Sequence, residues 1–246
     1  MSLRFHEIAE ANHRILNPFT EDKLMLLGQV CRLKPGMKQL DLACGKAEML
    51  CQWAQRYGIN GVGVDISDVF LAAARARAAE LGVASQITFV QEDAGKYQGD
   101  AQSFDVVSCI GATWIGNGLV GTLALMKPAL KPGGLLLVGE PYWIDPPPPE
   151  AYEALGVSKD GYTSLNGTFE RFEQARVELV EMVLANQDSW DRYAASQWMT
   201  LSDWLRDNPN DPDALAIRKW LNENRSAYLQ YGRRYLGWGV FVLRAA

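Results

Sequence analysis

Short apolar runs alternate with helix-like segments between residues 39 and 140, and this alternation limits the possible folds more than any other feature. Each run is rich in Val, Ile, Leu or Phe and is bounded by turn residues, which is typical of a β-strand. The predicted strands are residues 39–43, 61–65, 87–91, 104–110 and 135–140. The predicted helices between them are residues 47–57, 68–81 and 119–130. Near-continuous apolar strands favour a parallel sheet with helices on both faces, and therefore a doubly wound α/β fold.

Both ends of the chain add helices to this pattern. Residues 5–16 and 20–33 are predicted helices, whereas four prolines at 146–149 predict a stiff turn without regular structure. After residue 140 the expected elements are helices at 168–175, 189–206 and 213–236 and strands at 176–185 and 239–244. The whole pattern predicts a mostly parallel seven-stranded sheet with an antiparallel last strand. It also predicts N-terminal helices and a helical insertion between the last two strands.

Composition and charge exclude several classes of protein. The net charge is −5 and no block of Lys and Arg is present to neutralise phosphates, so no nucleic-acid partner is expected. The chain starts without an apolar signal core and has no apolar run of membrane-spanning length, which predicts a cytoplasmic protein without a membrane partner. The cysteines lack CxxC spacing and a neighbouring His, so we expect reduced thiols and no metal site. They are Cys31, Cys44, Cys51 and Cys109. The oligomeric state stays open.

Acidic residues follow the first three predicted strands. The first strand leads from Asp41 into a turn of small residues, where a ligand can lie against bare backbone. Asp65 ends the second strand, 24 positions after Asp41, and a carboxylate there can accept both ribose hydroxyls of a nucleoside. Asp93, after the third strand, can accept a hydrogen bond from an adenine amino group. Together these positions predict a nucleoside site at the carboxyl edge of the sheet.

The charge around the first turn indicates which nucleoside cofactor is expected. A dinucleotide needs its pyrophosphate at a helix N-terminus, and the carboxylates of Asp41 and Glu48 flank this turn and would repel it. The turn also lacks the G-x-G-x-x-G spacing. S-adenosylmethionine carries no phosphate, and its sulfonium and ammonium groups are attracted by acidic neighbours. The residues therefore favour S-adenosylmethionine.

The ordered series D-x-A-C-G-x-A-E, V-D-I-S, Q-E-D-A, F-D-V-V and L-K-P-G-G resembles the motifs of class I (Rossmann-like) S-adenosylmethionine-dependent methyltransferases. It is similar to the bacterial quinone-biosynthesis type and its uncharacterised relatives, over about residues 37–140. The family usually writes D-x-G-x-G-x-G, so Ala43 and Ala47 stand where two glycines are usual. The resemblance implies an enzyme that transfers a methyl group to a small-molecule acceptor, whose identity the sequence does not give.

The resemblance also implies a set of cofactor-binding residues. They are Asp41, Ala43 and Gly45 at the methionine portion with Cys44 in the same turn, Asp65 and Ile66 at ribose and adenine, Asp93 and Ala94 at the adenine edge, and Cys109 through its backbone carbonyl. On this reading the chain is one domain, 1–246. It divides into a helical cap at 1–36, a cofactor-binding core at 37–185, a helical insertion at 186–237 and a last strand at 238–246.

Candidate acceptor residues come from the carboxyl edge of the sheet and from the flanking helices. They are Arg14, Trp114, Glu140, Tyr142 and Tyr193. Glu140 is either a base or a structural carboxylate, and the two imidazoles, His6 and His13, are read as surface or capping residues, so no catalytic residue is assigned. If Tyr193 belongs to an acceptor lid, Tyr193→Phe slows turnover and leaves cofactor affinity unchanged.

Methyl transfer from a sulfonium needs mainly alignment of the acceptor and exclusion of water. A general base is required only when the acceptor arrives protonated. Two alternatives stay open at this stage. One is a nicotinamide oxidoreductase of the same fold, and the other is a non-catalytic module that binds S-adenosylmethionine.

Overall fold

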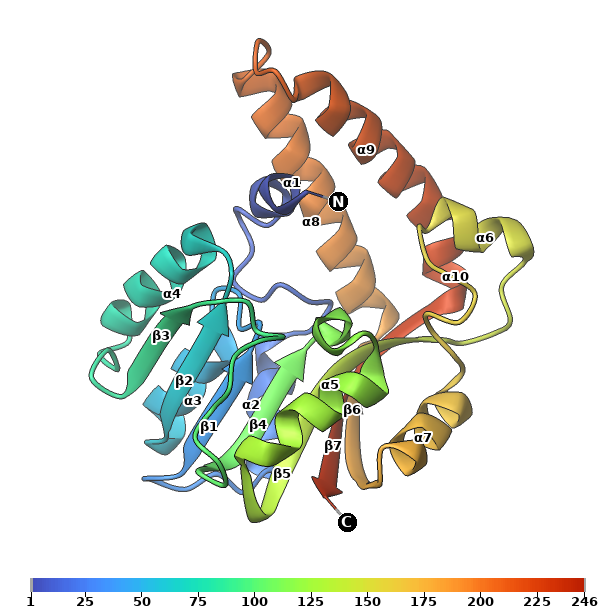
Figure 1. The fold of residues 1–246 in the computed structure, drawn as a ribbon. Helices are drawn as coiled ribbons and strands as arrows, with labels where there is room; N and C mark the ends of the chain where they lie inside the picture. Colours follow the sequence, from blue (N-terminus) through green and yellow to red (C-terminus); the bar gives the residue numbers. More distant parts are fainter. Residues whose placement is uncertain (1, 246) are drawn as a thin grey trace.

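The computed structural model describes residues 2–245. All of its strands form a single mixed sheet (Figure 1). The strand order is β3-β2-β1-β4-β5-β7-β6, and β7 runs antiparallel to both of its neighbours. The strands are β1 (Lys38–Leu42), β2 (Asn60–Asp65), β3 (Ile87–Gln91), β4 (Phe104–Ile110), β5 (Leu130–Trp143), β6 (Val177–Leu184) and β7 (Leu236–Ala245). The predicted fold class, with its antiparallel last strand, is confirmed. Strand order reverses between β1 and β4, which is where such sheets bind ligands.

Helices cover both faces of the sheet, because successive strand residues point to opposite sides. Val106 packs in one hydrophobic cluster with Trp53 of α3, while its neighbour Val107 packs in the other with Phe172 of α7. The helices of the first face are α2 (Glu21–Val30), α3 (Glu48–Tyr57) and α4 (Asp68–Glu80). Those of the second face are α5 (Leu119–Met126) and α7 (Leu165–Gln174), with the short helices η1 (Thr113–Gly116) and η2 (Lys127–Ala129) beside them.

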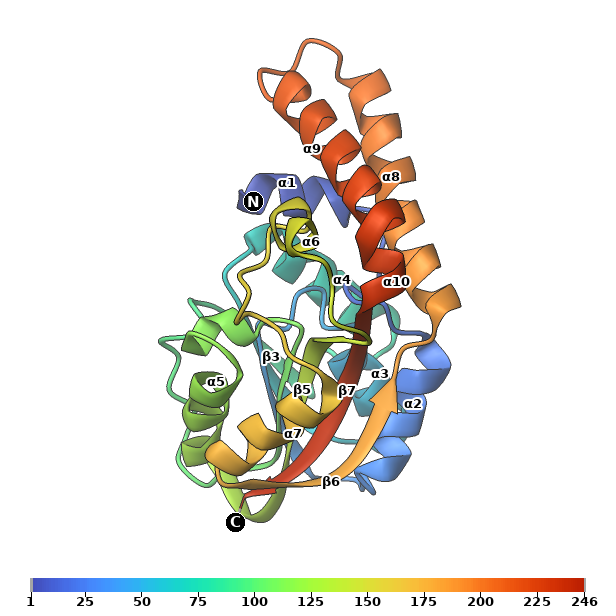
Figure 2. The same ribbon diagram turned by 90° about the vertical axis from the view of Figure 1, so that its right-hand side faces the viewer.

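The insertion between β6 and β7 is a helical hairpin that rises above the carboxyl edge of the sheet (Figure 2). It consists of α8 (Gln187–Asp207) and α9 (Ala214–Ala227), and α1 (Leu3–Ala9) packs against its side. Buried Ala9, Leu201 and Ile217 join these three helices in a small hydrophobic cluster of their own. The N-terminal residues are therefore held directly above the ligand-binding edge.

The predicted helix 5–16 is wrong in its second half, because α1 ends at Ala9. The Lys46 ammonium caps this segment. It donates hydrogen bonds to the carbonyls of Glu10, Ala11 and His13 at 2.7, 2.9 and 2.7 Å. The Glu10 carbonyl also accepts the backbone N–H of His13 at 3.0 Å, so the segment forms a turn around this lysine of the β1–α3 turn instead of a longer helix. The chain then continues as an irregular segment to Thr20, the residue before α2.

Two further elements differ from the predictions. The proline run 146–149 was expected to lack regular structure, yet α6 (Pro149–Ala154) starts on its last proline, which fits the first turn of a helix because no amide donor is needed there. The expected helix 213–236 is broken. After α9 ends, a π-helical turn η3 (Tyr228–Gly232) and a short α10 (Arg233–Tyr235) lead into β7. The hydroxyl of Tyr228 donates to Asp191 of α8 at 2.8 Å, which ties this turn to the hairpin.

Candidate functional site

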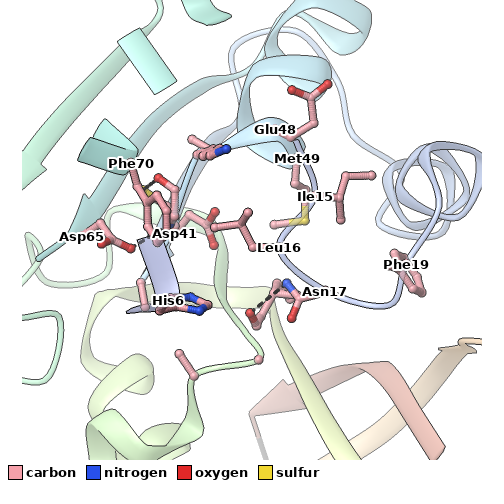
Figure 3. Close-up of a pocket in the computed structure, with 18 of the residues that line it drawn as sticks. His6, Ile15, Leu16, Asn17, Phe19, Asp41, Glu48, Met49, Asp65 and Phe70 are labelled. Atoms are coloured by element: carbon pink, nitrogen blue, oxygen red, sulfur yellow. Dashed lines mark hydrogen bonds between the residues drawn. The ribbon is translucent and has the colours of Figure 1, made fainter. Parts of the chain in front are cut away.

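A cavity of about 910 Å³ lies at the carboxyl ends of β1, β2 and β4, where strand order reverses (Figure 3). Its walls come from the β1–α3 turn, the ends of β2 and β4, and the irregular segment 14–19 after α1. Eleven of the predicted site residues line it. They are Arg14, Asp41, Ala43, Cys44, Gly45, Asp65, Ile66, Asp93, Ala94, Trp114 and Tyr193. The structure therefore brings most of the predicted set to one place.

The turn after β1 has left-handed backbone at every second residue. The φ angles are 56° at Ala43, 55° at Gly45 and 53° at Ala47. These are the three positions at which the family usually has glycine, and the conformation explains why, since glycine adopts it without a steric penalty. A Cβ on Gly45 would lie only 2.7 Å from Cδ1 of Leu16, which packs directly over the turn. The turn therefore presents its backbone closely to the cavity.

Ala43→Gly is expected to raise the free energy of unfolding by about 0.5 to 1 kcal/mol, because the left-handed strain on an alanine outweighs the extra freedom of glycine in the unfolded chain. Urea unfolding measures the change. A matched control is Ala72→Gly, an exposed position inside α4 with ordinary helical backbone, which is expected to lose roughly 0.5 to 1 kcal/mol. A loss of stability in Ala43→Gly would contradict the strain argument.

Asp65 joins the end of β2 to the turn after β1. Its Oδ2 accepts the backbone N–H of Gly45 at 2.8 Å, and its Oδ1 accepts that of Ser67 at 2.9 Å. Burial raises the pKa of Asp65, against the effect of these two hydrogen bonds. Each oxygen keeps a further lone pair, so the carboxylate can fix the turn and bind a ligand at the same time.

Asp41 lies below the turn as a second buried carboxyl. Ser108 of β4 donates its hydroxyl to Oδ1 at 2.6 Å. Burial raises the pKa of Asp41 to about 7, and the nearby charge of Asp65 adds to the rise. Two carboxyls held close together in a buried site are stabilised by a positive charge between or beside them. This part of the cavity therefore favours a cationic ligand.

Glu48 does not provide the free negative charge expected of it. Arg77 of α4 binds both of its oxygens, with Nε 2.9 Å from Oε2 and Nη2 2.7 Å from Oε1. Because this ion pair neutralises Glu48, the acidic character of the site comes from Asp41 and Asp65 instead. The expectation that Glu48 makes the turn acidic is therefore corrected.

The far end of the cavity, beyond Asp65, has an apolar floor and an acidic rim. Ile66 is 57 % exposed and Ala94 is buried. Asp93 accepts the backbone N–H of Gly95 at 3.0 Å, and its ion pair with Lys96 lowers its pKa, so it stays an ionised hydrogen-bond acceptor. An apolar surface beside such an acceptor suits a flat heterocycle with an amino group.

The segment between α1 and α2 forms the roof of the cavity, which was not predicted because residues 5–16 were expected to be helical. Leu16 covers Gly45, and Asn17 covers Gly111, where a Cβ would lie 2.2 Å from the Asn17 Oδ1. Asn17 also donates its side-chain amide to the carbonyl of Ile110 at 3.3 Å. The pair Asn17-Pro18 ended the predicted helix at residue 16, since proline disfavours helix in the residue before it, but it gave no sign that the helix ends at Ala9.

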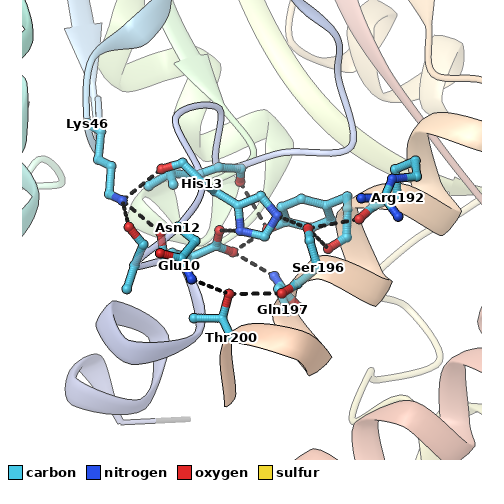
Figure 4. A network of polar contacts seen from close by, with 11 residues as sticks. Glu10, Asn12, His13, Lys46, Arg192, Ser196, Gln197 and Thr200 are labelled. Carbon is cyan, nitrogen blue, oxygen red and sulfur yellow. Dashed lines mark hydrogen bonds and ion pairs between the residues drawn. The ribbon is translucent and has the colours of Figure 1, made fainter. Parts of the chain in front are cut away.

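A buried polar network fixes this roof to the hairpin (Figure 4). Glu10 accepts hydrogen bonds on Oε1 from the Tyr193 hydroxyl and the Gln197 amide, both at 2.6 Å. His13 Nδ1 lies 2.9 Å from Oε2 of Glu10, and its Nε2 contacts the hydroxyl of Ser196. The predicted lid residue Tyr193 thus lines the cavity with its ring while its hydroxyl is held by Glu10.

Three predicted residues lie away from this cavity. Cys109 is fully buried in β4, and the two residues after it, Ile110 and Gly111, reach the cavity instead. Tyr142 is buried beside Gly237 of β7. Glu140 lines a smaller cavity nearby. Two predicted residues that do line the cavity also face solvent or an ion-pair partner. Arg14 pairs with Glu80 at 3.2 Å, and Trp114 is 72 % exposed at the cavity mouth.

The described residues also bear on metal and membrane binding. Within residues 2–245, no group of three or more His, Cys, Asp or Glu side chains is placed to hold a metal ion. In the same part of the chain, no helix has both the length and the apolar character needed to cross a membrane.

A doubly wound sheet with a strand-end carboxylate beside a tight first turn defines a Rossmann-like nucleoside-binding protein. Comparison with known proteins narrows this class. A family model described as a methyltransferase domain matches residues 40–134. The chain is 46 % identical, over 98 % of both sequences, to the "Uncharacterized protein YjhP" of Escherichia coli strain K12. The chain therefore contains a methyltransferase domain.

Solved structures agree with this assignment. The crystal structure of a SAM-dependent methyltransferase from Geobacter sulfurreducens, in complex with S-adenosyl-L-homocysteine, has a TM-score of 0.95 and 44 % identity and covers 100 % of this chain and 99 % of its own. A ubiquinone/menaquinone biosynthesis C-methyltransferase from Ectopseudomonas mendocina is 33 % identical over 55 % of this chain and 56 % of its own length. This chain belongs to the class I S-adenosylmethionine-dependent methyltransferases. The predicted family is confirmed, and with it a methyltransferase enzyme that uses S-adenosylmethionine.

Proposed function

We propose that this chain transfers the methyl group of S-adenosylmethionine to a small-molecule acceptor in the cytoplasm. The observation that carries this proposal is the pairing of Asp65 with the turn at Gly45, next to buried Asp41, on the floor of a large cavity. A cavity of about 910 Å³ is within the usual range for a cofactor of this size together with part of an acceptor.

The charges of the cavity fit a cationic cofactor better than a phosphate-bearing one. Among the described residues, the imidazole of His6, which was predicted to be a surface or capping residue, also lines the cavity. The two long basic side chains that line it have other partners: Lys46 donates to three backbone carbonyls and Arg14 pairs with Glu80. Neither Lys46 nor Arg14 is free to neutralise a pyrophosphate. The carboxyls of Asp41 and Asp65, by contrast, would repel phosphate and attract the ammonium and sulfonium groups.

The residues that would hold the cofactor follow from these surroundings. Asp65 would accept the ribose hydroxyls, and Ile66 would pack against the adenine, whose amino group would reach Asp93. Asp41 and the backbone of Gly45 would face the methionine portion. When bound, the cofactor supplies an electrophilic methyl group.

The chain's own contribution is to orient the acceptor and exclude water. Leu16 and Asn17 close the roof, while Trp190, Tyr193 and Trp238 give the wall an aromatic character. Such a wall suits a small organic acceptor, and the net charge of −5 supports the exclusion of nucleic acid. The four cysteines are free thiols, which supports a reducing, cytoplasmic location.

Isothermal calorimetry with S-adenosylhomocysteine and with NAD⁺ tests this function. We expect S-adenosylhomocysteine to bind at least about a hundredfold more tightly than NAD⁺, because only the dinucleotide must place phosphates beside the two carboxyls. Binding of NAD⁺ together with no response to S-adenosylhomocysteine would overturn the proposal.

A further inference from the structure

A second cavity, of about 380 Å³, adjoins the cofactor cavity. The two cavities share four lining residues: Gly111, Trp114, Pro141 and Trp238. These four residues form a wall common to both cavities at the carboxyl ends of β4 and β5. A molecule in the smaller cavity lies beside the cofactor site, and its size limits it to a small organic compound.

The chemistry of this smaller cavity comes from Glu140. This side chain is 3 % exposed, although it lines the cavity. The hydroxyl of Thr113 donates to its Oε2 at 2.6 Å, and Thr113 is itself fixed because its carbonyl accepts the Thr122 hydroxyl at 2.6 Å. Within residues 2–245, Oε1 of Glu140 accepts no hydrogen bond, and it is not among the side-chain atoms sealed from solvent. A buried carboxyl with one oxygen free toward a cavity can accept a proton.

The groups around Glu140 set its protonation. Burial raises the pKa of Glu140 to about 7, opposed by the Thr113 hydrogen bond and by the positive charge of Arg171 on α7. Arg171 is held by the carbonyls of Asp160 and Gly161 at 2.7 and 3.0 Å, so it does not reach Glu140 as a hydrogen-bond partner. Glu140 therefore titrates close to neutral pH, where a general base works best.

The other titratable neighbours of Glu140 stay neutral at this pH. Burial and the charge of Glu140 raise the pKa of the Tyr162 phenol. On β4, burial raises the pKa of the Cys109 thiol, and the charges of Asp41 and Glu140 raise it further. Near neutral pH, Glu140 is thus the group on this wall that gains or loses a proton.

The remaining walls suit a flat uncharged ring. Trp114, Trp238 and Tyr162 contribute aromatic side chains, and Val157 and Pro141 contribute apolar ones. An anionic acceptor would meet the carboxylate of Glu140 with no free cation beside it. A neutral aromatic with a hydroxyl group can stack on the rings and donate its hydrogen bond to Oε1.

We propose that the smaller cavity binds the methyl acceptor, that the acceptor is a small uncharged aromatic with a hydroxyl group, and that Glu140 removes the hydroxyl proton. This inference rests on the proposed function. The proton passes to Oε1 of Glu140 while the acceptor oxygen bonds to the methyl carbon. The carbon–sulfur bond breaks with its electron pair left on sulfur, so the products are a methyl ether and S-adenosylhomocysteine.

Binding of 2-naphthol to the protein saturated with S-adenosylhomocysteine gives a first test that does not depend on turnover. Calorimetry at pH 8 is expected to show binding of 2-naphthol at least about tenfold tighter than that of 2-methoxynaphthalene, which has no proton to donate, and no binding of 2-naphthoate. Glu140→Gln is expected to remove the tenfold preference and to leave the affinity for S-adenosylhomocysteine unchanged. Glu153→Gln, on the exposed side of α6, is the matched control and keeps the wild-type preference.

Methylation of 2-naphthol by S-adenosylmethionine is the second readout. In the wild type kcat/KM is expected to rise with pH through a midpoint near 7. Because burial also raises the pKa of Asp41 to about 7, the variant Thr113→Val assigns the midpoint: it removes a hydrogen bond that favours the ionised form of Glu140 and is expected to move the midpoint upward. Glu140→Gln is expected to lose at least about a hundredfold in kcat/KM.

Each contrary outcome contradicts a different part of the account. If S-adenosylhomocysteine binds and 2-naphthol does not, the acceptor class is wrong although the methyltransferase function stands. If Glu140→Gln keeps both the binding preference and the turnover, the role of Glu140 is wrong. Failure of the wild type to bind S-adenosylhomocysteine counts against the proposed function itself.

Discussion

Replacing Asp65 with alanine is expected to weaken binding of S-adenosylhomocysteine by at least about a hundredfold. The carboxylate is buried at the end of β2, and it holds the Gly45 amide at 2.8 Å and the Ser67 amide at 2.9 Å. Its removal takes away the acceptor for the ribose hydroxyls and also releases the turn that lies against the methionine portion. Each lost hydrogen bond to a charged group is worth roughly 1.5 to 3 kcal/mol, so two of them account for the effect.

Asp93→Ala is the matched comparison for this prediction. Asp93 also lines the cavity, but its side chain is 42 % exposed and pairs with Lys96, so its hydrogen bond to a ligand competes with water. We expect a loss of about tenfold or less, measured by calorimetry under the same conditions. Equal losses in the two variants, or an unchanged affinity in Asp65→Ala, would show that Asp65 is not the ribose acceptor.

The sheet was predictable because its strands are short apolar runs with clear turns at their ends. The predictions for 87–91 and 104–110 coincide with the bounds of β3 and β4. The position of Asp65 followed in the same way, since the end of a parallel strand fixes where its last side chain lies. Local sequence was sufficient for these features.

Features that depend on distant partners were not predictable in this way. The end of α1 is set by Lys46, more than thirty residues further along the chain, and the charge of Glu48 is cancelled by Arg77 from another helix. The smaller cavity likewise needs η1, β5 and the residues around Tyr162 to come together. No periodicity or motif in one segment reports such contacts.

Glu10 links the roof of the cofactor cavity to the hairpin, and Glu10→Ala is expected to lower the free energy of unfolding by about 3 kcal/mol. The side chain is fully buried, and the substitution leaves the Tyr193 hydroxyl, the Gln197 amide and His13 without their shared acceptor. Urea unfolding at pH 7 measures the loss. Tyr193→Phe removes one donor and keeps the charge, so it is expected to cost only about 1 kcal/mol.

The pH dependence separates this network from simple loss of packing. Burial raises the pKa of Glu10, but the ion-pair contact with His13 and the hydrogen bond from Tyr193 outweigh it, so the pKa in the folded protein lies below the ordinary value of 4.5. A lowered carboxyl pKa contributes stability that is present above pH 4.5 and is lost as the pH falls through the folded-state value. The stability difference between wild type and Glu10→Ala is therefore expected to persist from pH 7 down to about pH 5 and to shrink below it. A difference that stays constant down to pH 3 would mean that the ionised carboxylate contributes nothing, and that the roof is held by shape alone.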